Sequence, residues 1–211
     1  MLDGTAYGVV LNDRDERQAL SGAFGEPPYG KPPVAPVLYI KPRTCAAPSG
    51  AAVALPAGME VRVAATLALL FTRDTAKAER GRAFDGVGAV RLALDLAQPH
   101  ASYYRPAVRE LSRDGFLPLG ATAPFDASLG KATITTLVDG QEVHAWSLSR
   151  LARSLEDLIV DISSFMTFAA GDLLLVGLPG DAPHATIGQG VEARCDGLPG
   201  VRVQLVEEAL A

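Results

Sequence analysis

The chain has 211 residues, of which 48% are hydrophobic, 20% charged and 6% aromatic, and its formal net charge is −5. This length suits one domain with a substantial core. The acidic balance, without a run of basic residues, argues against nucleic-acid binding, which depends on Lys and Arg neutralising phosphates. High apolar content with low net charge argues against disorder.

Strong signals for a membrane or a secreted protein are missing from the sequence. No apolar run approaches the roughly 18 residues of a membrane-spanning helix, and residues 1–5 (MLDGT) have neither the basic nor the apolar part of a signal peptide. The two cysteines, Cys45 and Cys195, have no metal-type spacing. We expect a single globular domain spanning 1–211, cytoplasmic, with reduced thiols and no membrane contact.

The predicted strands dominate the chain, since 21 Gly and 15 Pro favour short strands over long helices. The first strand is expected at residues 4–11, and the Pro-rich stretch 25–36 is expected to be a loop. The other expected strands, from apolar patterning and a hairpin turn at Asp139-Gly140, are residues 37–41, 61–71, 88–97, 132–147 (both strands of the hairpin), 173–176, 191–195 and 201–206.

Three helical segments are predicted. Residues 12–20 suit a turn or two, and residues 76–84, rich in Ala and charge, suit a short helix. The strongest pattern runs from about 149 to 165, where one helical face carries Leu151, Leu155, Leu158, Ile159, Ile162 and Met166. The expected fold class is therefore mainly β or α+β, with one long packed helix.

Several common catalytic motifs are absent. The Gly-x-Gly pairs at 86–88 and 188–190 lack the third glycine of a dinucleotide site, and the Gly-Lys pairs at 30–31 and 130–131 do not complete a phosphate loop. The sequence contains no G-x-S-x-G, H-E-x-x-H or C-x-x-C. His100, His144 and His184 share no ligand-like spacing and are expected in surface or loop positions.

Polar residues within apolar sequence are the remaining candidates for a site. Lys41 ends an apolar strand, and Asp95 interrupts another, where a carboxylate needs a cation, a metal or several N–H donors. Residues 103–106 (YYRP) and 113–116 (RDGF) add aromatic and guanidinium groups. Two interpretations stay open: Asp95 pairs with a structural arginine, or these groups form a pocket for a small anion.

In order and spacing these segments resemble the fumarylacetoacetate hydrolase family over nearly the whole chain. Within that family the resemblance is strongest to the amino-terminal half of the isomerase/decarboxylases of 4-hydroxyphenylacetate (homoprotocatechuate) degradation. The residues that carry it are Leu11-Asn12, the Pro-Pro loop before residues 39–43 (YIKPR), Ala65-Thr66, residues 103–106, residues 113–120 (RDGFLPLG), 165–167 (FMT), Gly171-Asp172 and 177–179 (GLP).

The resemblance implies a mixed β-roll, a β-sandwich-like barrel, that is usually dimeric. It also implies a site for Mg²⁺ or Mn²⁺, which active members of the family bind through two glutamates spaced Glu-x-Glu on one strand and an aspartate from a later strand. In those members the metal chelates a 2-oxo acid and stabilises an enolate.

This sequence departs from that pattern. The glutamate positions correspond to Ala64 and Thr66, whereas Asp95 occupies the aspartate position. Leu111 stands where active members have a lysine, and Glu16 falls at about the position of a histidine. Asp95 with the Thr66 hydroxyl offers too few oxygens for octahedral Mg²⁺, so the sequence does not predict a bound metal in this chain.

The resemblance leads to two functional hypotheses. In the first, the chain is a subunit of an enzyme that decarboxylates 5-carboxymethyl-2-oxo-hex-3-ene-1,7-dioate or isomerises 2-hydroxyhepta-2,4-diene-1,7-dioate. Asp95 and Lys41 are then catalytic, and the predicted substrate-binding residues are Arg43, Thr66, Tyr104, Arg105, Arg113 and Asp114.

In the second hypothesis, the chain is a non-catalytic partner of a metal-bearing paralogue. The expected partners are a dicarboxylate substrate and either a second copy of the chain or a second subunit of the same family. A small-acid binding protein, or a C–C hydrolase acting on a β-diketone like other family members, is a weaker alternative.

Overall fold

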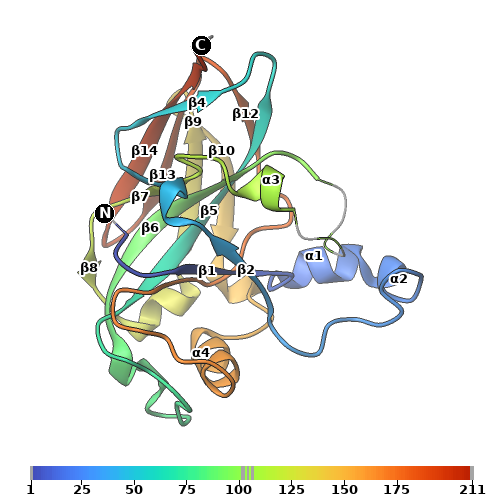
Figure 1. Ribbon diagram of the computed structural model, residues 1–211, viewed down its shortest axis with the longest axis vertical. Helices are drawn as coiled ribbons and strands as arrows, with labels where there is room; N and C mark the ends of the chain where they lie inside the picture. The colour runs from blue at the N-terminus through green and yellow to red at the C-terminus, as the bar shows by residue number, and fades with distance from the viewer. Residues whose placement is uncertain (1, 101–102, 104, 106, 210–211) are drawn as a thin grey trace.

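The structure, a computed structural model, describes residues 2–100, 103, 105 and 107–209. Two β-sheets form the framework of this part of the chain (Figure 1). The larger sheet contains β1 (Ala6–Val10), β2 (Val37–Lys41), β3 (Ala46–Pro48), β5 (Glu60–Phe71), β6 (Val87–Ala97), β7 (Leu117–Leu119), β8 (Ala123–Pro124), β11 (Leu173–Leu175) and β12 (His184–Thr186). The smaller contains β4 (Ala52–Leu55), β9 (Thr133–Val138), β10 (Gln141–Ser147), β13 (Gly190–Cys195) and β14 (Leu198–Glu207).

The larger sheet curls back on itself. Its main strand order is β2-β1-β11-β5-β6-β7-β3, yet only Pro42 and the 3₁₀ turn Arg43–Cys45 separate β2 from β3 along the chain. The two ends of the order are therefore close together, as expected for a roll. Side chains from β2 can consequently reach β6 across the inside of the curl.

The two faces of the curled sheet have different surroundings, because successive side chains of a strand point to opposite faces. On the outer face, residues such as Leu67 and Leu94 join one large apolar core with Ile134 and Val203 of the smaller sheet and Ile162 of a helix. On the inner face, a second cluster includes the small residues Ala6, Ala68 and Ala93 and the larger Leu117 and Leu173. Small side chains leave room inside the curl for the polar groups described below.

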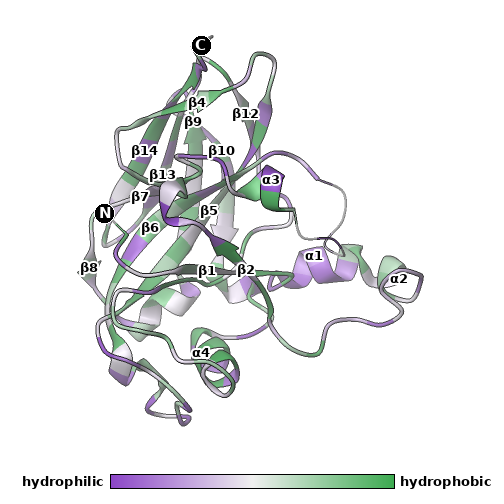
Figure 2. Cartoon of the chain, in the orientation of Figure 1, coloured by the Kyte–Doolittle hydropathy of each residue, from purple (hydrophilic) through white to green (hydrophobic). Residues whose placement is uncertain are grey.

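Helices are few and short in the described residues: α1 (Arg14–Ala19), α2 (Ser21–Phe24), α3 (Val108–Leu111) and α4 (Leu155–Ser163). The pair α1 and α2 projects at one side of the body (Figure 1). In Figure 2, α1 is mostly hydrophilic, and none of its residues is buried. In contrast, α4 buries Leu155, Leu158, Ile159 and Ile162.

The long helix predicted at about 149–165 is shorter in the structure. A capping box at Ser154, whose hydroxyl accepts from the Asp157 N–H at 3.1 Å, begins α4 at Leu155, and the helix ends at Ser163. The preceding Leu148–Arg150 forms a separate 3₁₀ turn. The apolar stripe is correctly predicted from Leu155 to Ile162, but the stripe continues past both real ends of the helix.

The helix predicted at 76–84 is wrong. The segment is irregular until the 3₁₀ turn Ala83–Gly86, and Lys77 and Gly81 have φ values of 49° and 79°. Its backbone bonds to another element: the N–H groups of Lys77 and Ala78 donate to the carbonyl and hydroxyl of Ser163 at 2.7 and 2.9 Å. Tertiary hydrogen bonds therefore override a local preference that favours helix.

The predicted strands are confirmed with small shifts in their ends, and the hairpin turns at Asp139-Gly140, with φ values of 51° and 78°. Both cysteines are free and buried. Among the helices of the described chain, none is long and apolar enough to cross a membrane.

Candidate functional site

The inner face of the curl brings the positions singled out by the resemblance together. In the register of β5 and β6, Ala64 pairs with Asp95 and Thr66 with Ala93. Cross-strand partners point to the same face, and so do residues two apart on one strand. Ala64, Thr66 and Asp95 therefore lie on one surface, and Arg62 extends the same row.

Asp95 is buried and paired with a lysine. Its side chain and that of Lys41 are both 0% exposed, with 3.2 Å between Asp95 Oδ1 and Lys41 Nζ. The Tyr39 hydroxyl donates to Asp95 Oδ2 at 2.6 Å. Burial, reinforced by the Asp95 charge, raises the pKa of Tyr39 well above its ordinary value, so Tyr39 stays a hydrogen-bond donor. Asp95 is thus paired with a cation. One of the two interpretations of the sequence expected an arginine there, whereas the structure has Lys41.

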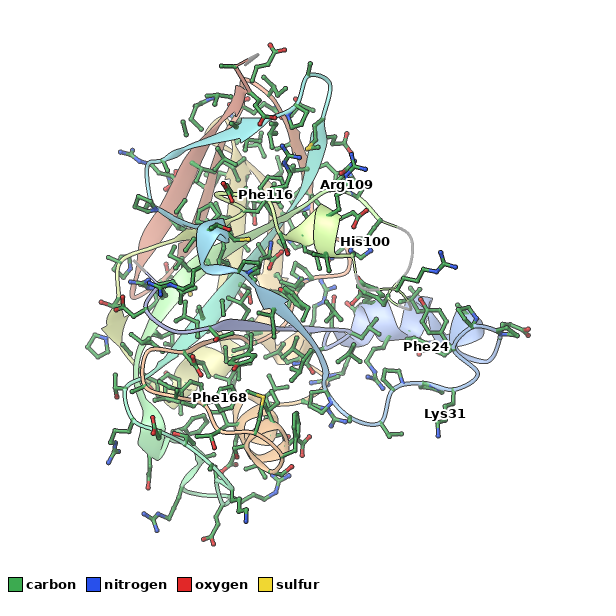
Figure 3. All side chains as sticks on the ribbon, in the orientation of Figure 1. Phe24, Lys31, His100, Arg109, Phe116 and Phe168 are labelled. Carbon is green, nitrogen blue, oxygen red and sulfur yellow. The ribbon has the colours of Figure 1, made fainter. Side chains whose placement is uncertain are left out.

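Lys41 holds the curl together from inside. Its ammonium donates to the carbonyls of Leu96, at 2.7 Å, and Phe116, at 3.0 Å, in addition to its ionic contact with Asp95. Phe116 itself lies within the body (Figure 3). These contacts link β2 to β6, through Asp95 and Leu96, and to Phe116, which immediately precedes β7.

Tyr39 reaches Asp95 because its ring crosses β1 at a glycine. A Cβ at Gly8 would lie 2.0 Å from the ring carbon Cζ of Tyr39. Any larger residue would have to push the ring away from the sheet, since real Cβ atoms do not approach this closely. Gly8 is therefore part of the arrangement around Asp95, although its sequence context did not mark it.

This donor set does not fit a divalent metal. Ala64 supplies no oxygen and packs in an apolar cluster with Val10, Phe24 and Leu178. The Thr66 hydroxyl donates to the Gly177 carbonyl at 2.6 Å. A hard cation such as Mg²⁺ needs about six oxygens, and a lysine ammonium already stands beside Asp95. Within the described residues, no three His, Cys, Asp or Glu side chains are grouped to hold a metal.

A second polar pair lies at the mouth of the curl. The Tyr103 hydroxyl donates to Glu16 Oε1 at 2.6 Å, while Glu16 Oε2 is buried without a hydrogen-bond partner among the described residues. Burial raises the pKa of Glu16, although the Tyr103 hydrogen bond and the Arg62 charge work in the opposite direction. Burial also raises the pKa of Tyr103. Arg62 donates to the Pro179 carbonyl beside this pair.

Replacing Glu16 with glutamine is expected to stabilise the folded chain modestly at pH 8. A carboxyl whose pKa is raised on folding favours the folded state below that pKa and opposes it above, so an ionised Glu16 costs stability. The gain over the parent chain should shrink as the pH falls towards about 4. Thermal unfolding at several pH values measures it. A gain that is independent of pH, or one matched by Glu142→Gln on the exposed strand β10, would contradict this prediction.

A cavity of about 390 Å³ adjoins these groups, between β2 and α3. Tyr39, Tyr103, Arg105 and Leu111 are among its lining residues. His100, another lining residue, lies beside α3 (Figure 3). The cavity thus combines an apolar wall with one guanidinium, which suits a small organic acid.

The predicted site residues divide into two groups. Lys41, Asp95 and Thr66 lie together on the inner face, and Arg105 lines the neighbouring cavity. The structure does not place the remaining described residues in that cavity: Arg43 and Asp114 are exposed, and Arg113 pairs with Glu208 at 3.2 Å beyond the end of β14. Tyr104 lies outside the described residues.

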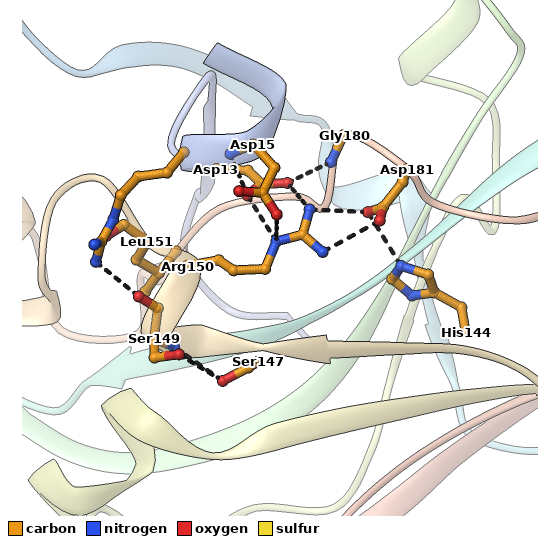
Figure 4. Close-up of polar contacts among 10 residues, drawn as sticks. Asp13, Asp15, His144, Ser147, Ser149, Arg150, Leu151, Gly180 and Asp181 are labelled. Carbon is orange, nitrogen blue, oxygen red and sulfur yellow. Dashed lines mark hydrogen bonds and ion pairs between the residues drawn. The ribbon is translucent and has the colours of Figure 1, made fainter. Parts of the chain in front are cut away.

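An arginine network holds α1, which carries Glu16, against the mouth of the curl (Figure 4). Arg150 bonds both oxygens of the buried Asp13, at 3.0 and 2.5 Å, and both oxygens of Asp181, at 3.2 and 3.1 Å. Asp13 also caps α1 and accepts from the Gly180 N–H at 2.9 Å. His144 contacts Asp181 at 3.1 Å. The network joins the start of α1, the 180–181 segment and the end of β10.

Comparison with known proteins agrees with the resemblance. Residues 5–206 match the family described as "Fumarylacetoacetate (FAA) hydrolase C-terminal". The chain is 34% identical to the 4-hydroxyphenylacetate degradation bifunctional isomerase/decarboxylase of Salmonella dublin, over 98% of this chain and 48% of that protein. It is also 30% identical to a mitochondrial oxaloacetate tautomerase of Oryza sativa subsp. japonica, over 79% of this chain and 78% of that one. The chain spans about half the length of the bifunctional relatives it matches.

Solved structures share the fold. A 5-carboxymethyl-2-hydroxymuconate delta-isomerase from Mycobacterium smegmatis has a TM-score of 0.83 at 23% identity, covering 100% of this chain and 81% of its own. A fumarylpyruvate hydrolase from Pseudomonas aeruginosa, in complex with Mn²⁺ and pyruvate, has a TM-score of 0.81 at 21% identity, covering 97% and 90%. With the curled sheet, the shared fold and a match over nearly its whole length, the chain belongs to the fumarylacetoacetate hydrolase family.

Proposed function

We propose that this chain is the metal-free subunit of an isomerase/decarboxylase acting on 2-oxo dicarboxylates in 4-hydroxyphenylacetate catabolism, paired with a metal-bearing member of the same family. Its similarity to the bifunctional enzymes, of which it spans about half, supports the pathway. The observation that supports a metal-free role for this chain, with the metal bound by the paralogue, is the Lys41–Asp95 ion pair opposite Ala64.

The arrangement around Asp95 suits a structural rather than a catalytic role. One Asp95 oxygen accepts from the partly buried Tyr39, and the other faces the ammonium of the buried Lys41. A general base must reach a substrate proton within hydrogen-bond distance. In the proposed assembly, this chain contributes a rigid roll, and the paralogue contributes the metal and the chemistry.

Activity and metal binding of the chain alone test this proposal. We expect no turnover of 2-hydroxyhepta-2,4-diene-1,7-dioate with added Mg²⁺ or Mn²⁺, and no binding heat in a Mg²⁺ titration. A chimera in which this chain replaces the matching half of the Salmonella dublin enzyme should isomerise the substrate. Turnover or tight Mg²⁺ binding by the unmutated chain alone, or a folded chimera without activity, would overturn the proposal.

The assignment of Ala64 and Thr66 to the two glutamate positions of the family can be tested separately. In the Ala64→Glu/Thr66→Glu variant, both glutamate positions are refilled on the face that carries Asp95. We expect this variant to gain measurable Mg²⁺ binding relative to the parent chain, and more so when Lys41→Met removes the competing ammonium. A folded triple variant that binds no Mg²⁺ would show that these positions are not the lost ligands.

A further inference from the structure

A second cavity, of about 510 Å³, lies on the inner face of the larger sheet away from Asp95. Leu2, Leu70 and Leu173 supply apolar walls, and Arg91 supplies one cation. Arg91 lies on β6 four residues before Asp95, which corresponds to about 13 Å along a strand. The cavity is thus separate from the candidate site and shares no lining residue with the cavity beside Tyr103.

Arg91 has no partner in the described part of the chain. No hydrogen bond or ion pair of its guanidinium is found there, and its Nε is buried without an acceptor. The side chain is half-buried, and burial lowers the pKa of Arg91. A desolvated guanidinium without an acceptor is costly, because its donors lose water and gain nothing in return. Such a group marks a position where an anion would be stabilised.

The nearby carboxylates do not fill this role. Asp172, next to the cavity residue Leu173, accepts from the N–H groups of Thr5 at 2.7 Å and Ala169 at 2.8 Å, and neither of its oxygens contacts Arg91 in the described part of the chain. Asp3 lines the cavity but is exposed at its rim and makes no contact with Arg91. Its charge would repel an anion held deeper in the cavity.

We propose that this cavity binds a small monocarboxylic acid, whose carboxylate pairs with Arg91 and whose apolar chain lies along Leu2, Leu70 and Leu173. The planar guanidinium can hold both oxygens of a carboxylate at once. An inorganic anion would satisfy the charge but make no apolar contact with Leu2, Leu70 or Leu173. The chemistry of the lining therefore favours an acid with an apolar body.

Titration of the full chain with hexanoate, followed by NMR chemical shifts, tests this proposal. We expect saturable binding with shifts at Leu70 and Leu173, and a loss of affinity of about tenfold or more in Arg91→Gln. Asp3→Asn should bind hexanoate more tightly, because the repelling charge is gone. Arg194→Gln, which removes an equal charge from an exposed pair with Glu192, should bind like the parent chain.

Two further probes separate the acid from other ligands. Neither 1-hexanol, which lacks the charge, nor inorganic phosphate, which lacks the apolar body, should bind at this position as well as hexanoate does. Arg91→Leu should fold at least as stably as the parent chain while binding no hexanoate, since the unpartnered charge is removed. Absence of saturable hexanoate binding, equal binding by Arg91→Gln, or equal binding of either probe would overturn the proposal.

Discussion

Replacing Lys41 with methionine is expected to destabilise the chain by about 3–5 kcal/mol at neutral pH. The side chains of Lys41 and Asp95 are both 0% exposed, so the variant leaves Asp95 buried without its cation. The carbonyls of Leu96 and Phe116 lose their lysine donor as well. Urea unfolding of parent and variant, compared at the same slope, measures the difference.

Two variants show whether the missing charge causes this loss. Lys41→Met/Asp95→Asn removes both charges and should recover part of the lost stability, because no uncompensated ion stays buried. Lys31→Met, in the loop where Lys31 is exposed (Figure 3), should stay within about 0.5 kcal/mol of the parent chain. A Lys41→Met variant as stable as the parent, or a double variant less stable than the single, would contradict the structural role of the pair.

The strands were predictable because their apolar patterns agree with their burial in the structure. Residues 37–41 form β2 as expected, and residues 61–71 correspond to β5 with one added residue. The short strands β3, β4, β7, β8 and β12 were not predicted, since two to four residues carry too little periodicity and pair only in the folded sheets. The ends of α4 depend on the Ser154 capping box, while the stripe used to predict it continues on both sides.

The candidate site was predictable as a set of residue types but not as a geometry. Lys41 and Asp95 stood out because charges are rare in apolar strands, and they form one buried pair. Arg113 was selected for another reason, as a guanidinium close in sequence to aromatic residues, yet it pairs with Glu208, because the loop before β7 directs it towards the end of β14. Sequence proximity to aromatic residues gives no direction to a loop side chain.

The sequence did not place three contributors, Arg62, Glu16 and Tyr103, in the site. Arg62 could have been found, since it lies two residues before Ala64 and must share its face of β5. The sequence singled out Glu16 and residues 103–106 separately but not their contact, because α1 and the segment before α3 meet only in the folded chain. The Arg150 network was missed for the same reason: its partners come from three segments far apart in sequence.

Replacing Arg150 with methionine is expected to cost about 3–5 kcal/mol at neutral pH. Asp13 is 0% exposed and pairs with Arg150 at 2.5 Å, so its carboxylate would stay buried with backbone N–H partners alone. Asp181 would lose two hydrogen bonds in the same step. Because Asp13 caps α1, the variant should also weaken the contact between Glu16 and Tyr103. Urea unfolding measures the change in the free energy of unfolding, and hydrogen exchange at α1 measures the weakened contact of this helix.

The pH dependence of the Arg150→Met variant shows whether its loss of stability comes from lost charge pairing or from lost packing. Burial works to raise the pKa of Asp181, but hydrogen bonds from Arg150 and His144 outweigh it and hold that pKa below its ordinary value. A carboxyl with a depressed pKa contributes stability above about pH 4, which is lost as the pH falls through its folded-state pKa. The parent chain should therefore lose more stability between pH 5 and pH 3 than Arg150→Met does, so their free energies of unfolding should converge in acid.

The control is Asp15→Asn. The Asp15 carboxylate is 69% exposed beside the same arginine, so this variant should behave like the parent chain. A constant gap between parent and Arg150→Met across that pH range would show that lost packing, and not lost charge pairing, accounts for the effect.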